Sequence, residues 1–172
     1  MLEGNPILAD KVTTSLADLL RRSLEIDLQT LVPMLEEIEN AQRYLMIVKA
    51  RFGDRFETIL DLSSEVTIAL IPAMVIQPLI ENVVQHGISA TSSKVTLTLR
   101  ARREESRLII QVLDDAVPDE KPLPQKSTGT GQHNIHQRLK LLYNGEASLT
   151  CFPVAGGYES RLSLPWRAIS RA

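Results

Sequence analysis

The spacing of hydrophobic residues alternates between a period near 3.6, typical of amphipathic helices, and a period near 2, typical of half-buried strands. The predicted order is helix, helix, strand, helix, strand, strand, irregular segment, helix, strand, strand. This order is typical of an α+β fold, an α/β sandwich in which a mixed, mostly antiparallel sheet carries helices on one face. The predicted helices are 10–25, 33–52, 76–87 and 131–143, and the predicted strands are 56–62, 94–102, 107–113, 147–152 and 158–164.

The first two predicted helices precede the sheet and form a segment of their own. Two amphipathic helices in tandem fit an antiparallel hairpin, or half of a bundle completed by another copy of the chain. They equally fit helices that pack on the domain that follows. We therefore divide the chain into a helical segment at 1–54, part of a dimerisation region, and a sheet-bearing domain at 55–172. The apolar stripe of the second helix is Leu35, Ile38, Ala41, Leu45 and Val48.

Composition narrows the class of protein. The chain has 172 residues, of which 44% are hydrophobic and 23% charged, as is usual for one globular domain. Its formal net charge of -2 argues against dedicated nucleic-acid binding, for which a basic surface is typical. The single Cys151 excludes an intramolecular disulfide and a cysteine-rich zinc site. No apolar run approaches the roughly 20 residues of a membrane-spanning helix.

The predicted helix at 76–87 has two unlike faces. One face is apolar and predicts burial, while the other gathers carboxylate, amide and imidazole groups with hardly any Lys or Arg. Asn82 and His86 lie four residues apart and share a face of a regular helix. Side-chain oxygens so placed suit Mg²⁺ that is also bound by phosphates and water, although a plain solvated face is the simpler interpretation. The apolar set is Ile76, Leu79, Ile80, Val83 and Val84, and the polar set is Gln77, Glu81, Asn82, Gln85 and His86.

Pro78 belongs either in the first turn of this helix or at a kink, and Gly87 is expected to end the helix. Asp114 and Asp115 follow a strand, where a carboxylate can accept a hydrogen bond from an exocyclic amine such as that of adenine, or can simply mark a turn. The irregular segment 114–130 is long enough to be a lid or binding loop.

A second stretch, 127–134, leads straight into the last predicted helix. It contains Gly129 and Gly131, and glycines let a backbone approach phosphate closely. The N–H groups at a helix start also favour an anion. Gly-x-Gly alone is as typical of a flexible hinge, and its position after the polar helix and Asp114 favours a phosphate site.

These stretches together resemble the C-terminal part of sensor histidine kinases of the LytS/YehU (autolysin-sensor) family, which carry a Bergerat-fold ATP-binding domain. Residues 76–87 are similar to the family's N-box, approximately L-Q-P-L-V-E-N-A-I-K-H-G. Residues 44–55 resemble Y-L-x-I-x-x-x-R-F-G-D-R, and residues 129–139 resemble G-x-G-L-x-N-V-x-x-R-L. The likeness extends over nearly the whole chain from about residue 10.

The resemblance implies ATP and Mg²⁺ as cofactors, with Asn82 as the Mg²⁺ ligand and Asp114 on the adenine amino group. In ATP-hydrolysing relatives a catalytic Glu lies four residues before the Mg²⁺ Asn, where this chain has Pro78. Proline cannot act as a base, which fits a kinase that phosphorylates a histidine. The implied catalytic residues are Asn82 and, as a supporting acid, Glu81, and the implied nucleotide-binding residues are Asn82, Gln85, His86, Asp114, Gly129, Thr130, Gly131, Gln132, His133 and Asn134.

Three departures from the family pattern alter these expectations. The H-F-L-F-N motif with the phosphate-accepting histidine is absent, so the chain should not phosphorylate itself and is either a fragment or a kinase without its acceptor. The family's D-N-G-x-G is replaced at 114–118, where Ala116 and Pro118 stand for the two glycines. The N-box Lys is Gln85. The last two changes predict weak ATP binding, or binding that needs a missing N-terminal part.

The resemblance also implies partners. These are a response regulator, a second copy bound through the N-terminal helices of the full-length protein, and no nucleic acid. It implies a membrane sensor region outside this chain, which makes these residues a cytoplasmic domain. One alternative is a degenerate, nucleotide-free scaffold, which Ala116 and Pro118 favour. Another is an anti-sigma-type kinase acting on Ser or Thr, which Pro78 argues against.

Overall fold

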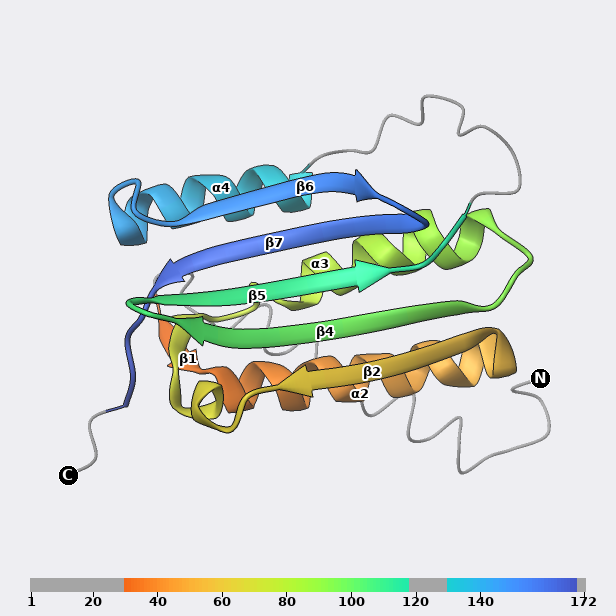
Figure 1. Cartoon of the computed structure of the whole chain (residues 1–172), viewed down its shortest axis with the longest axis horizontal. Helices are drawn as coiled ribbons and strands as arrows, with labels where there is room; N and C mark the ends of the chain where they lie inside the picture. The colour runs from red at the N-terminus through yellow and green to blue at the C-terminus, as the bar shows by residue number, and fades with distance from the viewer. Residues whose placement is uncertain (1–29, 118–129, 170–172) are drawn as a thin grey trace.

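A computed structural model describes residues 30–117 and 130–169 of the chain. This part is a two-layer sandwich in which helices α2, α3 and α4 cover one face of a five-stranded sheet (Figure 1). The strand order is β2-β4-β5-β7-β6. Strands β2 and β4 are parallel and the other neighbouring pairs are antiparallel, which confirms the predicted mixed, mostly antiparallel sheet.

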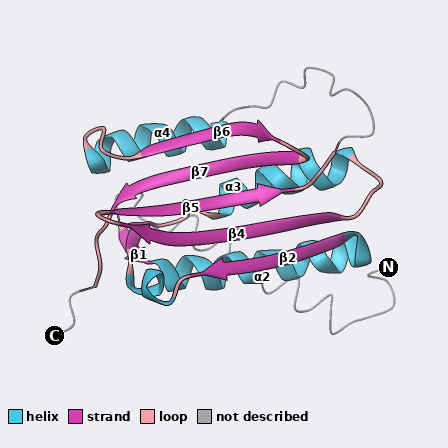
Figure 2. Ribbon diagram, viewed as in Figure 1, coloured by secondary structure: helices cyan, strands magenta, loops and turns pink. Residues whose placement is uncertain are grey.

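The elements lie close to their predicted places along the chain (Figure 2). The predicted helix at 10–25 lies outside the described residues. The strands are β1 (Leu31–Pro33), β2 (Phe56–Leu62), β3 (Leu70–Pro72), β4 (Val95–Glu104), β5 (Arg107–Asp114), β6 (Ser148–Val154) and β7 (Gly157–Pro165). The helices are α2 (Met34–Phe52), α3 (Gln77–Asn82) and α4 (Thr130–Tyr143), with short 3-10 segments η1 (Gly53–Arg55), η2 (Ser64–Ile68) and η4 (Ile88–Ala90) and a π-helical turn η3 (Val83–Gly87).

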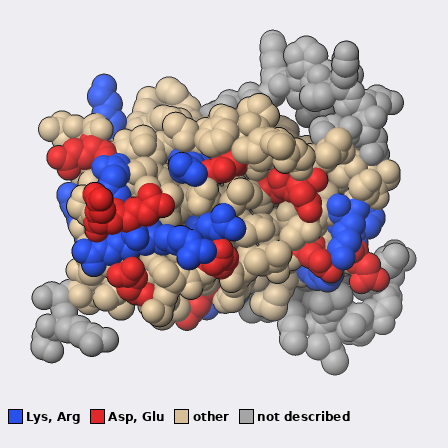
Figure 3. Space-filling view, in the orientation of Figure 1, with Lys and Arg blue, Asp and Glu red and all other residues tan. Residues whose placement is uncertain are grey.

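The sheet separates an apolar inner face from a charged outer face because successive side chains of a strand point to opposite sides. The alternating residues of β4 from Val95 to Ala101 are fully buried under the helices. On the outer face, Asp61 accepts hydrogen bonds of 2.8 Å from Arg100 Nε and Arg102 Nη2. Figure 3 shows Lys and Arg in a row on this face with acidic side chains beside them, as in a solvated surface.

Helix α2 packs on the sheet, as one of the two interpretations of the tandem helices predicted. Its buried residues belong to the same hydrophobic core as the strands and α3. Leu35, predicted in the apolar stripe, is instead 47% exposed, and Met34 is fully buried. The division of the chain at residue 54 stays a prediction, although α2 shares the core of the domain that follows it. The buried residues of α2 are Met34, Glu37, Ile38, Asn40, Ala41, Leu45 and Val48.

The helix at 76–87 begins as predicted and continues differently. Pro78 lies in the first turn of α3, where no hydrogen bond is lost. After Asn82 the chain widens into the π-helical turn η3 and tightens into η4, so helical backbone continues past Gly87. The expectation that Gly87 ends the helix was wrong: its φ is -86°, whereas a glycine that ends a helix usually has a positive φ.

Candidate functional site

The apolar face of α3 and η3 is buried as predicted, and this sets the position of Asn82. Ile76, Leu79 and Ile80 are fully buried against the core, and Val83 and Val84 are nearly so. Asn82, at the last position of α3, is half-buried. Its Nδ2 atom is buried and has no hydrogen-bond partner among the residues that the structure describes. An amide donor in this state has capacity left for a ligand.

The other polar residues of this helix differ from Asn82. Gln77 Nε2 donates a 2.8 Å hydrogen bond to Glu81 Oε1, so Glu81 already has a partner along the helix. Gln85 and His86 are exposed. The shared face predicted for Asn82 and His86 assumes a regular α-helix, whereas the chain here forms a π-helical turn with a spacing of five.

Asp114 ends β5 beside Gly87, so the structure brings the predicted adenine-binding carboxylate to the helix that carries Asn82. Asp114 is 8% exposed, and its Oδ1 accepts a 3.1 Å hydrogen bond from the Ala116 N–H. Burial raises the pKa of the Asp114 carboxyl to about 6, with a smaller contribution from the neighbouring Asp115 charge. A raised carboxyl pKa in a partly enclosed place is typical of functional sites.

Glycine at position 87 permits this approach. A Cβ added to Gly87 would lie 3.2 Å from the Ala116 Cβ and 3.5 Å from Asp114 Oδ1. Without a side chain there, η3 and the end of β5 can lie in direct contact. Asp115 faces elsewhere, because its Oδ1 accepts a 2.6 Å hydrogen bond from the Thr96 N–H of β4. Of the two acidic residues, Asp114 is the one available to a ligand.

Gly157, at the start of β7, fixes the backbone of Asp114 from the other side. A Cβ added to Gly157 would lie 1.7 Å from the Asp114 carbonyl oxygen, so no other residue fits without moving a strand. The register pairs Asp114 with Tyr158. No pattern in the sequence predicts this close approach of Gly157 to Asp114.

The glycine-rich stretch is described only from its helical end. Gly129 lies outside the described residues, and Thr130 and Gly131 form the start of α4. Gln132 is half-buried, while His133 and Asn134 are exposed and His133 Nε2 lies 2.8 Å from Gln137 Nε2. Of the predicted phosphate residues, His133 and Asn134 are thus accessible near the N-terminal end of α4.

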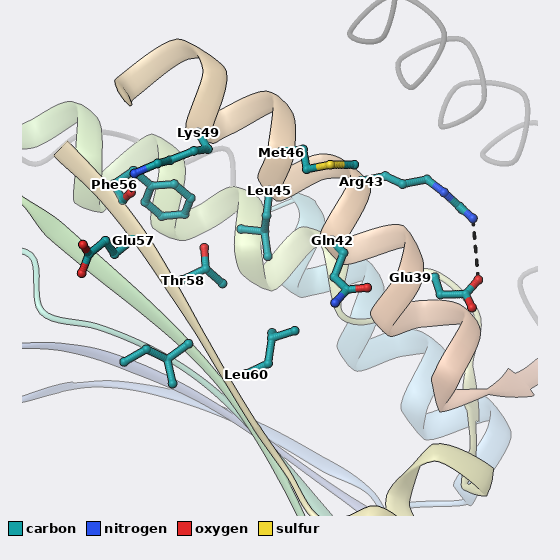
Figure 4. A pocket seen from close by; sticks show the side chains of 11 residues that line it. Glu39, Gln42, Arg43, Leu45, Met46, Lys49, Phe56, Glu57, Thr58 and Leu60 are labelled. Carbon is teal, nitrogen blue, oxygen red and sulfur yellow. Dashed lines mark hydrogen bonds and ion pairs between the residues drawn. The ribbon is translucent and has the colours of Figure 1, made fainter. Parts of the chain in front are cut away.

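A groove of about 780 Å³ lies elsewhere, between α2 and the edge strand β2 (Figure 4). Leu45, Met46 and Leu60 contribute apolar surface to it, and Lys49 Nζ at one end donates a 2.7 Å hydrogen bond to the Phe56 carbonyl. None of the predicted site residues lines this groove. Because the Asp114 carboxylate lies beside Gly87 and the Asn82 amide has no partner for its Nδ2 among the described residues, we place the candidate site at α3 and η3.

Two further observations concern metals and membranes. In the described ranges, no three or more His, Cys, Asp or Glu side chains are grouped closely enough to hold a metal ion. No helix within those ranges is both long enough and apolar enough to span a bilayer.

Comparisons with known proteins identify relatives of this chain. The family model described as histidine kinase matches residues 1–56. The sensor protein LytS of Oceanobacillus iheyensis is 32% identical over 171 residues, which cover 92% of this chain and 29% of that protein. The histidine kinase domain of the blue-light activated kinase EL346 from Erythrobacter litoralis has a TM-score of 0.57 at 15% identity, covering 94% of this chain and 76% of that one. Full-length ShkA in complex with AMPPNP has a TM-score of 0.58 at 19% identity, covering 85% and 33%.

The chain spans less than a third of the length of the LytS relative. At such low identity, the solved structures establish the fold, which is that of histidine kinase catalytic domains and agrees with the expected Bergerat type. The sequence comparisons agree with the resemblance to the LytS/YehU family and cover 92% and 91% of the chain. The chain is therefore similar to LytS-type sensor proteins over most of its length, and its residues 1–56 match the histidine kinase family.

Proposed function

We propose that this chain is the ATP-binding part of a sensor histidine kinase and donates the γ-phosphate of ATP to a histidine outside these 172 residues. One observation carries the proposal: the buried Asn82 amide nitrogen, which has no partner within residues 30–117 and 130–169, and the Asp114 carboxylate lie on elements that meet at Gly87. A donor and an acceptor in adjacent positions suit a ligand that is anionic at one end and carries an amine at the other.

The chemistry of these two residues fits Mg²⁺·ATP. The side-chain oxygen of Asn82 is a hard oxygen ligand, and Mg²⁺ is usually held by one or two such ligands together with phosphates and water. The Asn82 Nδ2 would then donate to a phosphate oxygen and no longer be unsatisfied. Asp114 would accept a hydrogen bond from the adenine amino group, and Gly87 lets the helix that carries Asn82 lie against this carboxylate.

The phosphate end is completed in this proposal by the stretch from Gly129 to Asn134, because the start of α4 offers free N–H groups and a favourable dipole. Bound Mg²⁺·ATP supplies the phosphoryl group, and the protein's task is positioning and charge neutralisation. Pro78 provides no base to activate water. Gln85 and His86 contact the nucleotide from the exposed side of η3, and Glu81 supports Asn82.

The remaining parts of the proposal follow from the family. The partner is a response regulator that receives the phosphoryl group from the acceptor histidine. The N-terminal helices form a homodimer in the full-length protein, and a membrane sensor region outside this chain makes the kinase region cytoplasmic. The support for these three points is the similarity to LytS, a sensor protein.

Isothermal titration of the 172-residue chain with Mg²⁺·AMPPNP tests the proposal. The wild type should bind, more weakly than low micromolar because of Ala116, Pro118 and Gln85. Asn82→Ala and Asp114→Asn should each weaken binding at least tenfold, which corresponds to about 1.4 kcal/mol. Gln42→Ala, an exposed amide in the α2–β2 groove, is the matched control and should change nothing.

A nucleotide-free scaffold is the second candidate, favoured by the buried methyl group of Ala116 where the family has glycine. It predicts no heat of binding in the wild type. Binding that is lost in Gln42→Ala and kept in Asn82→Ala would place the ligand in the α2–β2 groove and contradict the proposal.

A further inference from the structure

The turn that leads into α3 lacks a local cap. Residues Ala73 to Ile76 contain no Ser, Thr, Asp or Asn, the residues that usually cap a helix start. Met74 in this turn has a φ of 56°, in the left-handed region that is unfavourable for a residue other than glycine. The start of the helix that carries Asn82 therefore needs support from elsewhere in the chain.

Glu37 of α2 provides this support. Its Oε1 accepts a 2.8 Å hydrogen bond from the Met74 N–H, and its Oε2 accepts bonds of 3.1 and 3.3 Å from the Val75 and Ile76 N–H groups. Glu37 is 3% exposed. Burial raises the pKa of its carboxyl above the ordinary range, and the three N–H groups and the nearby Arg138 charge act in the opposite direction.

Two other segments hold the same turn. Arg138 of α4 donates a hydrogen bond to the Ala73 carbonyl, and the Ala73 N–H donates a 3.1 Å bond to the Thr30 carbonyl just before β1. The turn is thus a junction between the chain entering β1, helix α2 and helix α4, which begins in the glycine-rich stretch. Figure 1 shows α2, α3 and α4 on the same face of the sheet.

We propose that Glu37 is a positioning residue that sets the place of Asn82, and with it the Mg²⁺ end of the nucleotide site. The inference rests on the function proposed above. Asn82 lies six residues after Ile76 along continuous helix, a distance of about 9 Å, so a shift at the start is carried to the amide. Asp114 is held by Ala116 and Gly157 as well as by Gly87 of this helix, so its position depends less on Glu37 than that of Asn82 does.

Glu37→Gln tests whether Glu37 positions the Asn82 end of the proposed site more than the Asp114 end. Glutamine keeps the size of the side chain but has one acceptor oxygen, and its NH₂ group would face N–H donors. We expect the affinity for AMPPNP in excess Mg²⁺ to fall about tenfold, while the affinity measured in EDTA changes less than twofold. Glu36→Gln is the matched control, because Glu36 is exposed on the same turn of α2 and its substitution removes the same charge. It should leave both affinities unchanged.

Two more variants distinguish positioning from general destabilisation. Ile38→Val shortens a buried neighbour on α2 and should lower stability while keeping the Mg²⁺-dependent gain in affinity. Glu37→Asp keeps the charge, but its shorter side chain moves the carboxylate away from the turn, so the Mg²⁺-dependent gain in affinity should fall several-fold. This variant also tests the positioning role if Glu37→Gln does not fold. Equal losses with and without Mg²⁺ in both Glu37 variants, or no loss, would overturn the positioning role. Absence of binding in the wild type would instead overturn the proposed function, and this inference with it.

Discussion

The two ends of the proposed nucleotide site are built differently. Asp114 is fixed by its neighbours. The Ala116 N–H donates a hydrogen bond to its carboxylate, Gly87 lies against that carboxylate, and Gly157 packs closely against its backbone carbonyl. Asn82 is half-buried, and its Nδ2 has no partner within the described part of the chain. One end is part of the folded framework, and the other is the end that, in the proposed function, a ligand completes. Changes at the adenine end should therefore affect stability and binding together, and changes at the phosphate end mainly binding.

The largest effect is expected for Gly157→Ala. Its Cβ would lie 1.7 Å from the Asp114 carbonyl oxygen, so β5 and β7 must separate locally. We expect a loss of about 3 kcal/mol or more in the free energy of unfolding, together with loss of nucleotide binding. Gly156→Ala is the matched control. It has open space around it and a φ of 80°, so only backbone strain of about 1 kcal/mol applies. Chemical denaturation compares the two, and equal losses would contradict the close packing at Asp114.

A smaller effect is expected from the protonation of Asp114. The folded protein holds this proton up to about pH 6, well above the unfolded chain, because the carboxyl is buried. The folded state therefore binds more protons between about pH 4 and pH 6, and stability from this group is gained as the pH falls and lost as it rises through 6. Between pH 7.5 and pH 4.5 the wild type should gain up to about 2 kcal/mol in the free energy of unfolding relative to Asp114→Asn. Denaturation curves at several pH values measure this, and a constant difference would contradict it.

The smallest effect is a gain at the phosphate end. Gln85 is exposed on η3 and stands where the family has a Lys that is expected to reach phosphate. Gln85→Lys should raise the affinity for Mg²⁺·AMPPNP a few-fold, about 0.5–1 kcal/mol, with an unchanged melting temperature. The gain should shrink at high salt, because the new charge is exposed. Titration at two salt concentrations measures this gain in affinity. A change of stability without a change of affinity would contradict the claim that changes at the phosphate end affect mainly binding.

Local patterns along the chain were sufficient to predict most elements. The alternation in β4 and β5 and the three-four spacing in α2 follow directly from burial on one face, so their bounds differ little from the prediction. Asp114 was identified as a possible ligand because it ends a strand, and Asn82 because it lies on a polar helix face. The structure brings their two elements together at Gly87.

Contacts between residues far apart in the chain could not be predicted from the sequence. The contact between Glu37 and the turn before α3 joins positions 39 residues apart and follows from no local pattern. A charged residue beside Ile38 on the apolar side of α2 was the available signal, and it was missed. The π-helical turn at Val83–Gly87 also has no periodic signature over so few residues, which is why Gly87 was expected to end the helix.

The most direct test of the central claim is solution NMR of the ¹⁵N-labelled chain with Mn²⁺·AMPPNP, in which Mn²⁺ replaces Mg²⁺ and broadens nearby signals. If Asn82 and Asp114 bind opposite ends of one nucleotide, the Asn82 side-chain amide should broaden first. The Gly87 and Ala116 backbone amides should shift with only moderate broadening. Broadening centred on Gln42 and Met46 in the α2–β2 groove, or no change at Asn82, would contradict the account.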